Sequence, residues 1–394
     1  MIGSQAVDIL LVSDLFPPRT GGSGRWLWEL YRRLEGVRIH IAAGEAPDSE
    51  SFDRGSPVPI VRVPLSFRNW GISNPRAAFQ YGRATRLISR LVRDVRPGTM
   101  HCGKCLPEGL IASLMKRRHG ISFACFVHGE ELTLAATSRE LSWLTRRVLH
   151  DAAHVIANSA HSKTLLRTWG LADDKVTVMH PGVDTSRFVP SSVDVEARQR
   201  LGWVDRTVIL TVGALQKRKG QDMMIRALPA LRARFPNVLY SIVGEGWEKT
   251  YLERLADELG VRDRVQFRGV PGDGELVTCY QQCDLFALPN RQVGWDIEGF
   301  GIVLLEAQAW GKPVITGSSG GTAEAIGPGE TGVVVPCETV EPLVNAVSDM
   351  LEHEDRAAQM GARGRDRAVS QFDWRVLSRQ AQALFARPSV AAAR

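Results

Sequence analysis

Short apolar, β-branched stretches alternate with amphipathic ones through the first half of the chain. Val7–Val12 is almost continuously apolar, which is typical of a strand buried on both faces of a sheet. Strands are predicted at 7–12, 38–42, 60–64, 99–102, 122–127, 154–157 and 175–179, and helices near 25–35, 75–95, 107–118, 139–150 and 160–169. This alternation predicts a parallel sheet covered by helices on both faces.

Turn residues interrupt the pattern at His180-Pro181-Gly182 and at 189–192, and a second strand–helix series follows. Its strands are predicted at 207–212, 238–243, 265–267, 285–288, 313–316 and 332–335, and its helices near 220–234, 247–259, 273–282, 302–310, 340–352, 355–369 and 373–386. The predicted fold class is α/β, with two Rossmann-like, doubly wound domains at 1–187 and 188–372. A C-terminal helix at 373–394 is expected to pack back on the first domain. Ligands bind beyond the carboxyl ends of such strands, so we expect both domains to face a central cleft.

The composition fits this fold. The 394 residues are 44% hydrophobic and 23% charged, as in a soluble globular protein. No apolar run approaches membrane-spanning length, and the N-terminal residues enter a strand pattern at once, without a basic and apolar leader. We therefore expect a cytoplasmic protein.

The net charge of +6 is uneven along the chain. Residues 1–187 hold 25 Lys and Arg against 17 Asp and Glu, a balance of +8, whereas the remainder holds 24 against 26, a balance of −2. Part of the excess is a stripe on the helix predicted at 75–95, with Phe79, Leu87, Leu91 and Val95 available to its other side. The stripe consists of Arg76, Arg83, Arg86, Arg90 and Arg93. A solvated face and contact with anionic lipid headgroups are the two interpretations. Nucleic acid is not an expected partner, because the arginines are not interleaved with exposed aromatics and no recognition motif occurs.

Six cysteines are scattered through the chain. Cys102 and Cys105, preceded by His101, are the pair with metal-ligand spacing. A zinc site needs a second pair of similar spacing, which the sequence lacks. Buried free thiols are therefore the favoured interpretation, and no metal is expected.

The richest stretch in candidate chemistry runs from Asp296 to Glu306. Glu298 lies in a Gly-containing turn, and Glu306 lies in an apolar run that predicts a helix. Free N–H groups at the start of such a helix bind anions. Glu306 would lie about one turn further in, where it could accept hydrogen bonds from neutral hydroxyls. A phosphate, a diol and a second carboxylate together suggest a nucleotide sugar.

Three other strand ends carry residues suited to such a ligand. Strand 207–212 leads to Lys217-Arg218-Lys219-Gly220, and three consecutive cations suit a diphosphate, with a solvated basic loop as the alternative. Strand 7–12 leads to a Gly-rich loop around Gly22, which by itself is a weak signal. His128 follows strand 122–127, where it could orient a hydroxyl, carry part of a developing charge or serve as a structural histidine.

Taken together, the motifs resemble those of the retaining family-four glycosyltransferases of GT-B fold, over nearly the full chain. Within that family the chain is similar to phosphatidylinositol mannosyltransferases and exopolysaccharide glycosyltransferases. The features that carry it are the loop 16–22, His128-Gly129-Glu130-Glu131, the turn 180–184, residues 218–222, the Glu298–Glu306 unit and the turn 319–321.

The resemblance implies a role for each matching residue. His128, Glu298 and Lys219 are the implied catalytic residues, the first two beside the donor sugar and the third on the diphosphate. Glu306 is implied to bind the ribose, and Val270 lies where the family reads the base. The implied donor site comprises Gly22, Lys217, Arg218, Lys219, Val270, Glu298, Gly299, Phe300, Gly301, Ile302 and Glu306.

One position departs from the family pattern. The family has Arg where this chain has Ala214, and that Arg pairs with the diphosphate lysine on the distal phosphate. Its absence removes a bidentate donor from a reaction that depends on charge stabilisation. We hypothesise that the enzyme is still active, with Lys217 or Arg218 as substitutes.

The sequence thus predicts a retaining, metal-independent hexosyltransferase in glycolipid or polysaccharide biosynthesis, using GDP-mannose or a UDP-sugar. The expected acceptor is lipid-linked, a glycan or a small molecule, with peripheral contact at the inner face of an anionic membrane. The alternatives are a nucleotide-sugar epimerase of the same architecture and a catalytically weakened nucleotide-sugar-binding protein. A dehydrogenase is more distant, because the first Gly loop lacks the GxGxxG spacing.

Overall fold

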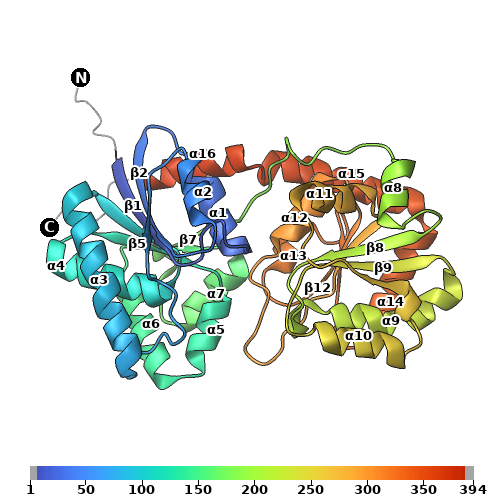
Figure 1. The fold of residues 1–394 in the computed structure, drawn as a ribbon, viewed down its shortest axis with the longest axis horizontal. Helices are drawn as coiled ribbons and strands as arrows, with labels where there is room; N and C mark the ends of the chain where they lie inside the picture. Colours follow the sequence, from blue (N-terminus) through green and yellow to red (C-terminus); the bar gives the residue numbers. More distant parts are fainter. Residues whose placement is uncertain (1–6, 387–394) are drawn as a thin grey trace. The chain divides into compact units, whose positions relative to one another are not determined.

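The computed structural model describes residues 7–386 and divides into two compact units (Figure 1). Unit 1 combines Met1–Pro181 with Trp374–Arg394, and unit 2 is Gly182–Asp373. Residues 1–6 and 387–394, the ends of two predicted ranges, lie outside the described residues. The last helix therefore belongs to the unit that begins the chain.

Unit 1 is built on a seven-stranded parallel sheet of order β3-β2-β1-β4-β5-β6-β7. Its strands are β1 (Val7–Ser13), β2 (Val37–Gly44), β3 (Ile60–Val63), β4 (Thr99–Cys102), β5 (Phe123–Val127), β6 (His154–Ala157) and β7 (Val176–Val178). Its helices are α1 (Gly22–Tyr31), α2 (Ser49–Arg54), α3 (Pro75–Val95), α4 (Leu110–His119), α5 (Glu130–Ala136), α6 (Arg139–Asp151), α7 (Ala160–Thr168) and α16 (Trp374–Phe385).

Unit 2 repeats the design with a six-stranded parallel sheet of order β10-β9-β8-β11-β12-β13. Its strands are β8 (Thr207–Val212), β9 (Val238–Val243), β10 (Val265–Phe267), β11 (Leu285–Leu288), β12 (Val314–Gly317) and β13 (Val333–Val335). Its helices are α8 (Val195–Leu201), α9 (Gln221–Arg234), α10 (Lys249–Glu258), α11 (Asp273–Gln282), α12 (Ile302–Ala309), α13 (Thr322–Ala325), α14 (Glu341–Glu352) and α15 (Glu354–Gln371).

The apolar strand runs form the centre of each unit. Every residue of β5, β9 and β11 is buried, as expected for parallel strands covered on both faces. The predicted strands are all confirmed to within about two residues at each end. Prediction missed α2, α5, α8 and α13, which have seven residues or fewer. Helices this short leave too few turns for an apolar periodicity to be read.

Helix α16 packs on the rest of unit 1 through aromatic contacts. The ring of Phe385 stacks on Tyr31 with centroids 5.9 Å apart and meets His101 edge-on at 4.6 Å. Burial lowers the pKa of His101 to about 3, so this histidine is neutral, and its Nδ1 lies in hydrogen-bond contact with the Tyr31 hydroxyl. His101 is thus part of the core, and Cys102 and Cys105 are buried free thiols, as the sequence predicted.

Helix α3 carries the arginine stripe and corrects one detail of the prediction. Pro75 occupies its first turn, and the Asn74 side chain accepts a hydrogen bond from the backbone N–H of Arg76, which fixes the helix start. All five arginines are exposed. Phe79, expected on the other side, is 70% exposed and lies three residues after one arginine and four before another, hence on the same face. The basic face therefore includes an exposed aromatic ring.

The described part of the chain was also searched for membrane spans. None of the helices between residues 7 and 386 is both long enough and apolar enough to cross a bilayer.

Helix α15 approaches the end of α12 so closely that only glycine fits at the contact. A Cβ at Gly361 would lie 2.0 Å from the carbonyl oxygen of Gly311. We predict that Gly361→Ala lowers the free energy of unfolding of unit 2 by about 1–3 kcal/mol, the usual cost of overpacking. Differential scanning calorimetry measures the change.

Gly82→Ala in α3 is the matched control. A Cβ at Gly82 meets nothing within 4 Å, so this substitution should raise the free energy of unfolding of unit 1 by about 0.5–1 kcal/mol through helix propensity. Equal effects of the two substitutions would contradict the close packing of α15 against α12.

Candidate active site

The turn after β8 holds the basic segment of unit 2 in a fixed conformation. Residues Lys217–Lys219 form a short 3-10 turn, and the Lys219 side chain passes Gly213, where a Cβ would lie 3.7 Å from its Cε. Gly220 has φ +74°, and a Cβ there would lie 1.8 Å from the carbonyl oxygen of Pro289. Glycine is therefore required at this turn, both for its backbone angle and for its contact with the end of β11.

An ion pair outside the basic triplet fixes the same segment from the other side. Arg291 binds Asp222 through two parallel hydrogen bonds of 2.9 and 2.7 Å, and both side chains are nearly buried. The backbone N–H of Arg291 also donates to the carbonyl oxygen of Arg218 at 2.9 Å. Sequence analysis did not find this bidentate pair, because its two members lie 69 positions apart.

A cluster of two cations and two carboxylates forms the centre of the candidate site. Lys219 Nζ lies 2.5 Å from Glu298 Oε2, and Arg218 Nη1 donates to the same oxygen. Arg218 Nε lies 2.9 Å from Asp296 Oδ1. Glu298 is only 8% exposed. Burial alone would raise the pKa of Glu298, but Lys219 and Arg218 outweigh it and hold the pKa below its ordinary value.

Backbone contacts fix the turn that follows Glu298. The carbonyl oxygen of Glu298 accepts a hydrogen bond of 3.1 Å from the N–H of Gly321. At Gly320, with φ +71°, a Cβ would lie 1.8 Å from that oxygen. Phe300 is 2% exposed and packs in the core of unit 2, so a ligand can meet its backbone but not its ring. Gly320 and Gly321 thus hold the turn in place through close contacts with the carbonyl oxygen of Glu298.

Helix α12 starts directly after this turn, as the sequence predicted. Gly301 precedes Ile302 with φ +84°, and no side chain of the described residues caps the helix start. The first N–H groups of a helix have no intrahelical partners, so this end is suited to an anion. Gly301 is buried, and Gly299 and Ile302 are half-buried.

Glu306 lies one turn into α12 and is 3% exposed. Its Oε2 accepts a hydrogen bond of 2.6 Å from the hydroxyl of Tyr280 in α11. Tyr280 is itself held by stacking on Phe286 and by an edge contact with Phe188. The tyrosine orients the carboxylate, and its role could not be read from the sequence because Tyr280 precedes Glu306 by 26 residues.

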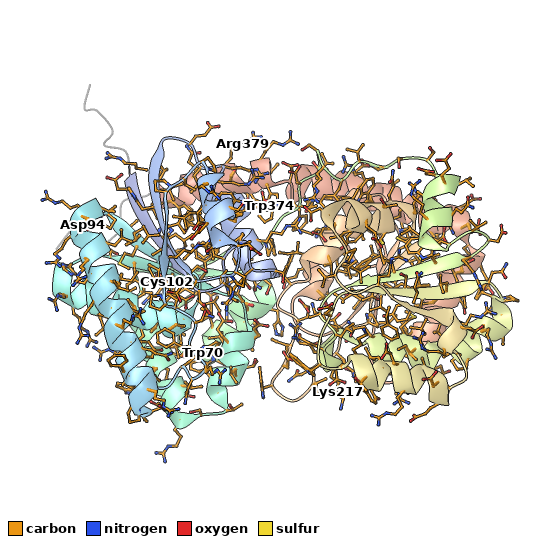
Figure 2. All side chains as sticks on the ribbon, in the orientation of Figure 1. Trp70, Asp94, Cys102, Lys217, Trp374 and Arg379 are labelled. Atoms are coloured by element: carbon orange, nitrogen blue, oxygen red, sulfur yellow. The ribbon has the colours of Figure 1, made fainter. Side chains whose placement is uncertain are left out.

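The remaining donor-site candidates of unit 2 are exposed. Lys217, labelled in Figure 2, is solvent-exposed and lies two residues before Lys219 in the same 3-10 turn. Val270 is 63% exposed and follows Gly269, whose carbonyl oxygen accepts a 2.7 Å hydrogen bond from Gly244. Ala214 is exposed in the turn after β8. The structure therefore brings Arg218, Lys219 and Glu298 into contact and leaves these three at the surface.

In unit 1, the structure buries His128 at the end of β5 and defines its tautomer. Its Nε2 lies 2.7 Å from the carbonyl oxygen of Gly103, which can only accept, so Nε2 carries the proton. The backbone N–H of His128 donates to Glu131 and its carbonyl oxygen accepts from Asn158. With Nε2 bonded to Gly103, Nδ1 is the ring nitrogen left for a ligand. Gly22 is the exposed first residue of α1.

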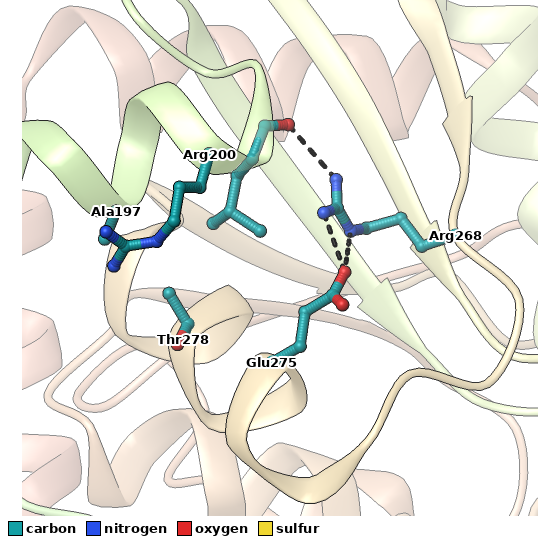
Figure 3. A pocket seen from close by; sticks show the side chains of 6 residues that line it. Ala197, Arg200, Arg268, Glu275 and Thr278 are labelled. Carbon is teal, nitrogen blue, oxygen red and sulfur yellow. Dashed lines mark hydrogen bonds and ion pairs between the residues drawn. The ribbon is translucent and has the colours of Figure 1, made fainter.

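Two further observations concern other ligands. No group of three or more His, Cys, Asp or Glu side chains within residues 7–386 is arranged to hold a metal ion. A shallow pocket of about 320 Å³ lies between α8 and α11 (Figure 3). The guanidinium of Arg268 there is bonded to Glu275 at 2.8 Å and to the carbonyl oxygen of Leu201 at 3.2 Å. None of the predicted site residues lines this pocket.

Comparison with known families matches both units. Residues 20–187 match Glycosyltransferase Family 4, and residues 194–367 match Glycosyl transferases group 1. The fold is similar to that of the Anabaena protein HepE in complex with UDP-glucose. The TM-score is 0.81 at 21% identity, covering 96% of this chain and 99% of that one.

Two curated mycobacterial proteins are similar over nearly the whole chain. Both are named GDP-mannose-dependent alpha-(1-6)-phosphatidylinositol monomannoside mannosyltransferase. The one from Mycolicibacterium smegmatis is 36% identical over 93% of this chain and 95% of its own length. The one from Mycobacterium tuberculosis is 32% identical over 94% and 96%. With both units matched and this identity over its length, the chain belongs to the family-four, group 1 glycosyltransferases of GT-B fold.

Proposed function

We propose that this glycosyltransferase transfers mannose from GDP-mannose to a hydroxyl of a phosphatidylinositol-type glycolipid, with retention of configuration and without a metal ion. The names of the two mycobacterial relatives support the donor and the acceptor. The observation that carries the proposal is the contact of Lys219 and Arg218 with the buried carboxylate of Glu298, beside the start of α12.

The charges in this cluster explain how it would bind a nucleoside diphosphate. Lys219 and Arg218 are held close to the turn before α12 by Glu298 and Asp296, so the two cations are already in place when a diphosphate arrives. Phosphate oxygens would take over hydrogen bonds that now go to Glu298. The carboxylate released by this exchange would accept hydrogen bonds from sugar hydroxyls. The ligand thereby replaces an ion pair that has already lost most of its hydration.

Departure of the diphosphate is the step that needs stabilisation. Negative charge grows on the phosphate oxygens as the glycosidic bond breaks, and donors fixed before the reaction stabilise that charge. Lys219, Arg218 and the first N–H groups of α12 supply these donors, and Lys217 adds a solvent-exposed cation. These groups can do the work that a divalent ion does in other phosphate sites. The Glu306 carboxylate, oriented by Tyr280, would accept from the ribose hydroxyls.

Unit 1 contributes the second set of proposed groups. His128 has a fixed ring, with Nε2–H bonded to Gly103, so Nδ1 can accept a hydrogen bond from a sugar hydroxyl. The exposed Gly22 begins α1 and lets backbone approach a ligand without a side chain in between. We propose that these two residues act on the donor sugar and its phosphate.

Contact with an anionic membrane is the proposed way of reaching a lipid acceptor. The basic face of α3 presents five exposed arginines around the exposed ring of Phe79. Cationic side chains near an anionic surface gain about 1 kcal/mol each, and an aromatic ring can enter the interface between headgroups and acyl chains.

A non-catalytic sugar-nucleotide-binding protein is the second candidate, and the exposed Ala214 is the observation in its favour. Lys219 already has a guanidinium beside it, because Arg218 contacts the same carboxylate oxygen of Glu298. The side chain of Arg218 is only 13% exposed. This arrangement favours the enzyme over the binding protein.

The first prediction tests the donor site. Lys219→Ala should weaken GDP binding by about ten- to hundredfold, the value of a hydrogen bond to a charged group, and should abolish most mannose transfer. Glu306→Gln should weaken GDP binding by about tenfold. Arg254→Ala is the matched control, since this exposed cation of α10 lies outside the proposed donor site, and it should leave GDP binding unchanged.

Calorimetric titration of GDP, UDP and ADP measures binding, and mannose transfer from GDP-mannose to a mannosylated phosphatidylinositol is assayed with excess EDTA. Unchanged GDP affinity in both variants would remove the assigned site. Conversion of GDP-mannose without any acceptor would favour an epimerase, and loss of transfer in EDTA would refute metal independence.

The second prediction concerns Ala214. Since Arg218 already places a guanidinium at the cluster, Ala214→Arg should change the turnover of GDP-mannose by less than about tenfold. Steady-state kinetics at saturating acceptor checks this. A gain of several orders of magnitude would mean that the natural site is impaired.

The third prediction concerns the basic face of α3. Reversal of Arg83, Arg86 and Arg90 to Glu should abolish sedimentation with vesicles that contain anionic phospholipid, and high salt should do the same to the unaltered protein. Reversal of three exposed cations of unit 2, Arg226, Lys249 and Arg254, is the matched control and should leave binding intact. Equal loss in both variants would indicate a diffuse charge effect rather than a docking face.

A further inference from the structure

A fully buried carboxyl group lies next to the carboxyl end of β1 in unit 1, and it is not one of the predicted site residues. Glu108 belongs to the segment Cys105–Gly109, between β4 and α4, and is 0% exposed. Its Oε1 accepts a 2.8 Å hydrogen bond from the backbone N–H of Asp14. Its Oε2 is buried and has no hydrogen-bond partner in the described part of the chain. Burying a carboxyl group with one unpaired oxygen costs free energy, so packing alone does not explain the position of Glu108.

Asp14, which Glu108 holds, is the first residue beyond β1 and connects several loops. Its Oδ1 accepts hydrogen bonds from Arg19 at 3.1 Å and from the Ser66 hydroxyl at 2.9 Å. Its Oδ2 lies 3.4 Å from Nζ of Lys104, which is 8% exposed and lies 5.0 Å over the ring of Trp70. The loops that follow β1, β3 and β4 therefore converge on one carboxylate.

The glycine-rich segment 15–24 begins at this anchor and ends inside α1. A Cβ at Gly24 would lie 2.7 Å from the carbonyl oxygen of Leu15, so the segment is folded tightly onto itself. Arg62 of β3 donates to the carbonyl oxygen of Pro17 at 2.7 Å. The exposed Gly22 lies within this segment. The place of Asp14 therefore determines where the segment starts, and the Glu108 carboxyl determines the place of Asp14.

The surroundings of Glu108 favour its neutral form. Burial raises its pKa to about 7, the charge of Lys104 and the hydrogen bond from Asp14 act against that rise, and the Asp14 carboxylate adds to it. The other titratable groups that act on this place are the hydroxyl of Tyr81, the carboxylate of Glu131, and the thiols of Cys102, Cys105 and Cys125. Ionised Glu108 would add a second negative charge beside Asp14, and Lys104 would then be shared between two carboxylates.

We propose that Glu108 is a positioning residue for sugar transfer, which acts through Asp14 and Lys104 on the glycine-rich segment 15–24. The protonated carboxyl keeps Asp14 paired with Lys104 and keeps the segment in its working conformation. Ionisation draws Lys104 away from Asp14 and loosens the segment. The expected effect on mannose transfer rests on the proposed function, whereas the expected effect on the conformation of segment 15–24 does not.

Two substitutions separate the hydrogen bond from the charge. Glu108→Gln keeps an oxygen that can accept from Asp14 but cannot ionise, and Glu108→Ala removes the acceptor. Asp8→Asn is the matched control, because this carboxylate lies at the opposite end of β1 and pairs with Arg38 at 2.9 Å. Mannose transfer between pH 6 and 8.5, GDP affinity by calorimetry, and amide exchange of a peptide covering residues 10–18 are measured for each protein.

The unaltered enzyme should lose kcat as the pH rises through 7, whereas Glu108→Gln should be within about threefold of it at pH 6 and flat above. Glu108→Ala should lose about tenfold in kcat at every pH and should speed amide exchange at Asp14, with GDP affinity unchanged. The Asp8→Asn protein should follow the unaltered enzyme throughout.

Superimposable pH profiles of the unaltered and Glu108→Gln enzymes would overturn the proposal. So would a Glu108→Ala protein with full activity and unchanged amide exchange. A protein that binds no nucleotide and transfers no mannose in its unaltered form would refute the proposed function instead. Amide exchange at Asp14 in the Gln and Ala variants would then still decide whether Glu108 positions the segment.

Discussion

One buried carboxylate, that of Glu298, determines how the candidate site of unit 2 is arranged. Two cations converge on its Oε2, and its backbone carbonyl is fixed by the turn at Gly320–Gly321. Burial at this depth raises the pKa of a carboxyl group, but Lys219 and Arg218 hold the pKa of Glu298 below its ordinary value. The same contact keeps two long, flexible cationic side chains in one place before a ligand arrives. Such preorganisation lowers the cost of binding, because less side-chain freedom remains to be lost.

Glycine makes this arrangement possible at two points. At Gly220 and Gly320 a side chain would overlap a backbone carbonyl oxygen, and both residues have positive φ. The first lets the basic segment lie against the end of β11, and the second lets the turn before α12 lie against the end of β12. Strand ends in a parallel sheet lie side by side, so turns that follow different strands can share one site only if their backbones approach closely.

In unit 1, too, polar and charged side chains hold loops at the ends of strands in place. The Asp14 side chain accepts from donors in three loops, and the Glu108 carboxyl accepts from its backbone N–H. Buried charges are costly unless they are paired, so their presence at the ligand edge of the sheet indicates a requirement for precise loop placement. The candidate site residues of both units thus lie on short loops held by polar and ionic contacts, at the ends of sheets whose cores are almost entirely apolar.

The sequence by itself determined the elements and the location of the candidate chemistry. Apolar runs and turn residues are local signals, so the strands, the longer helices and the start of α12 before Glu306 could all be predicted. What the sequence could not determine were partners far apart in the chain. Arg218 reaches Glu298 across 80 positions, and Glu108 reaches Asp14 across 94. Only the tertiary structure decides such pairs, because strand order and burial, rather than residue spacing, bring them together. The same limit applies to Phe79 at the surface. Helical spacing gives its angular position on α3, but only the packing of α3 shows which side of the helix faces solvent.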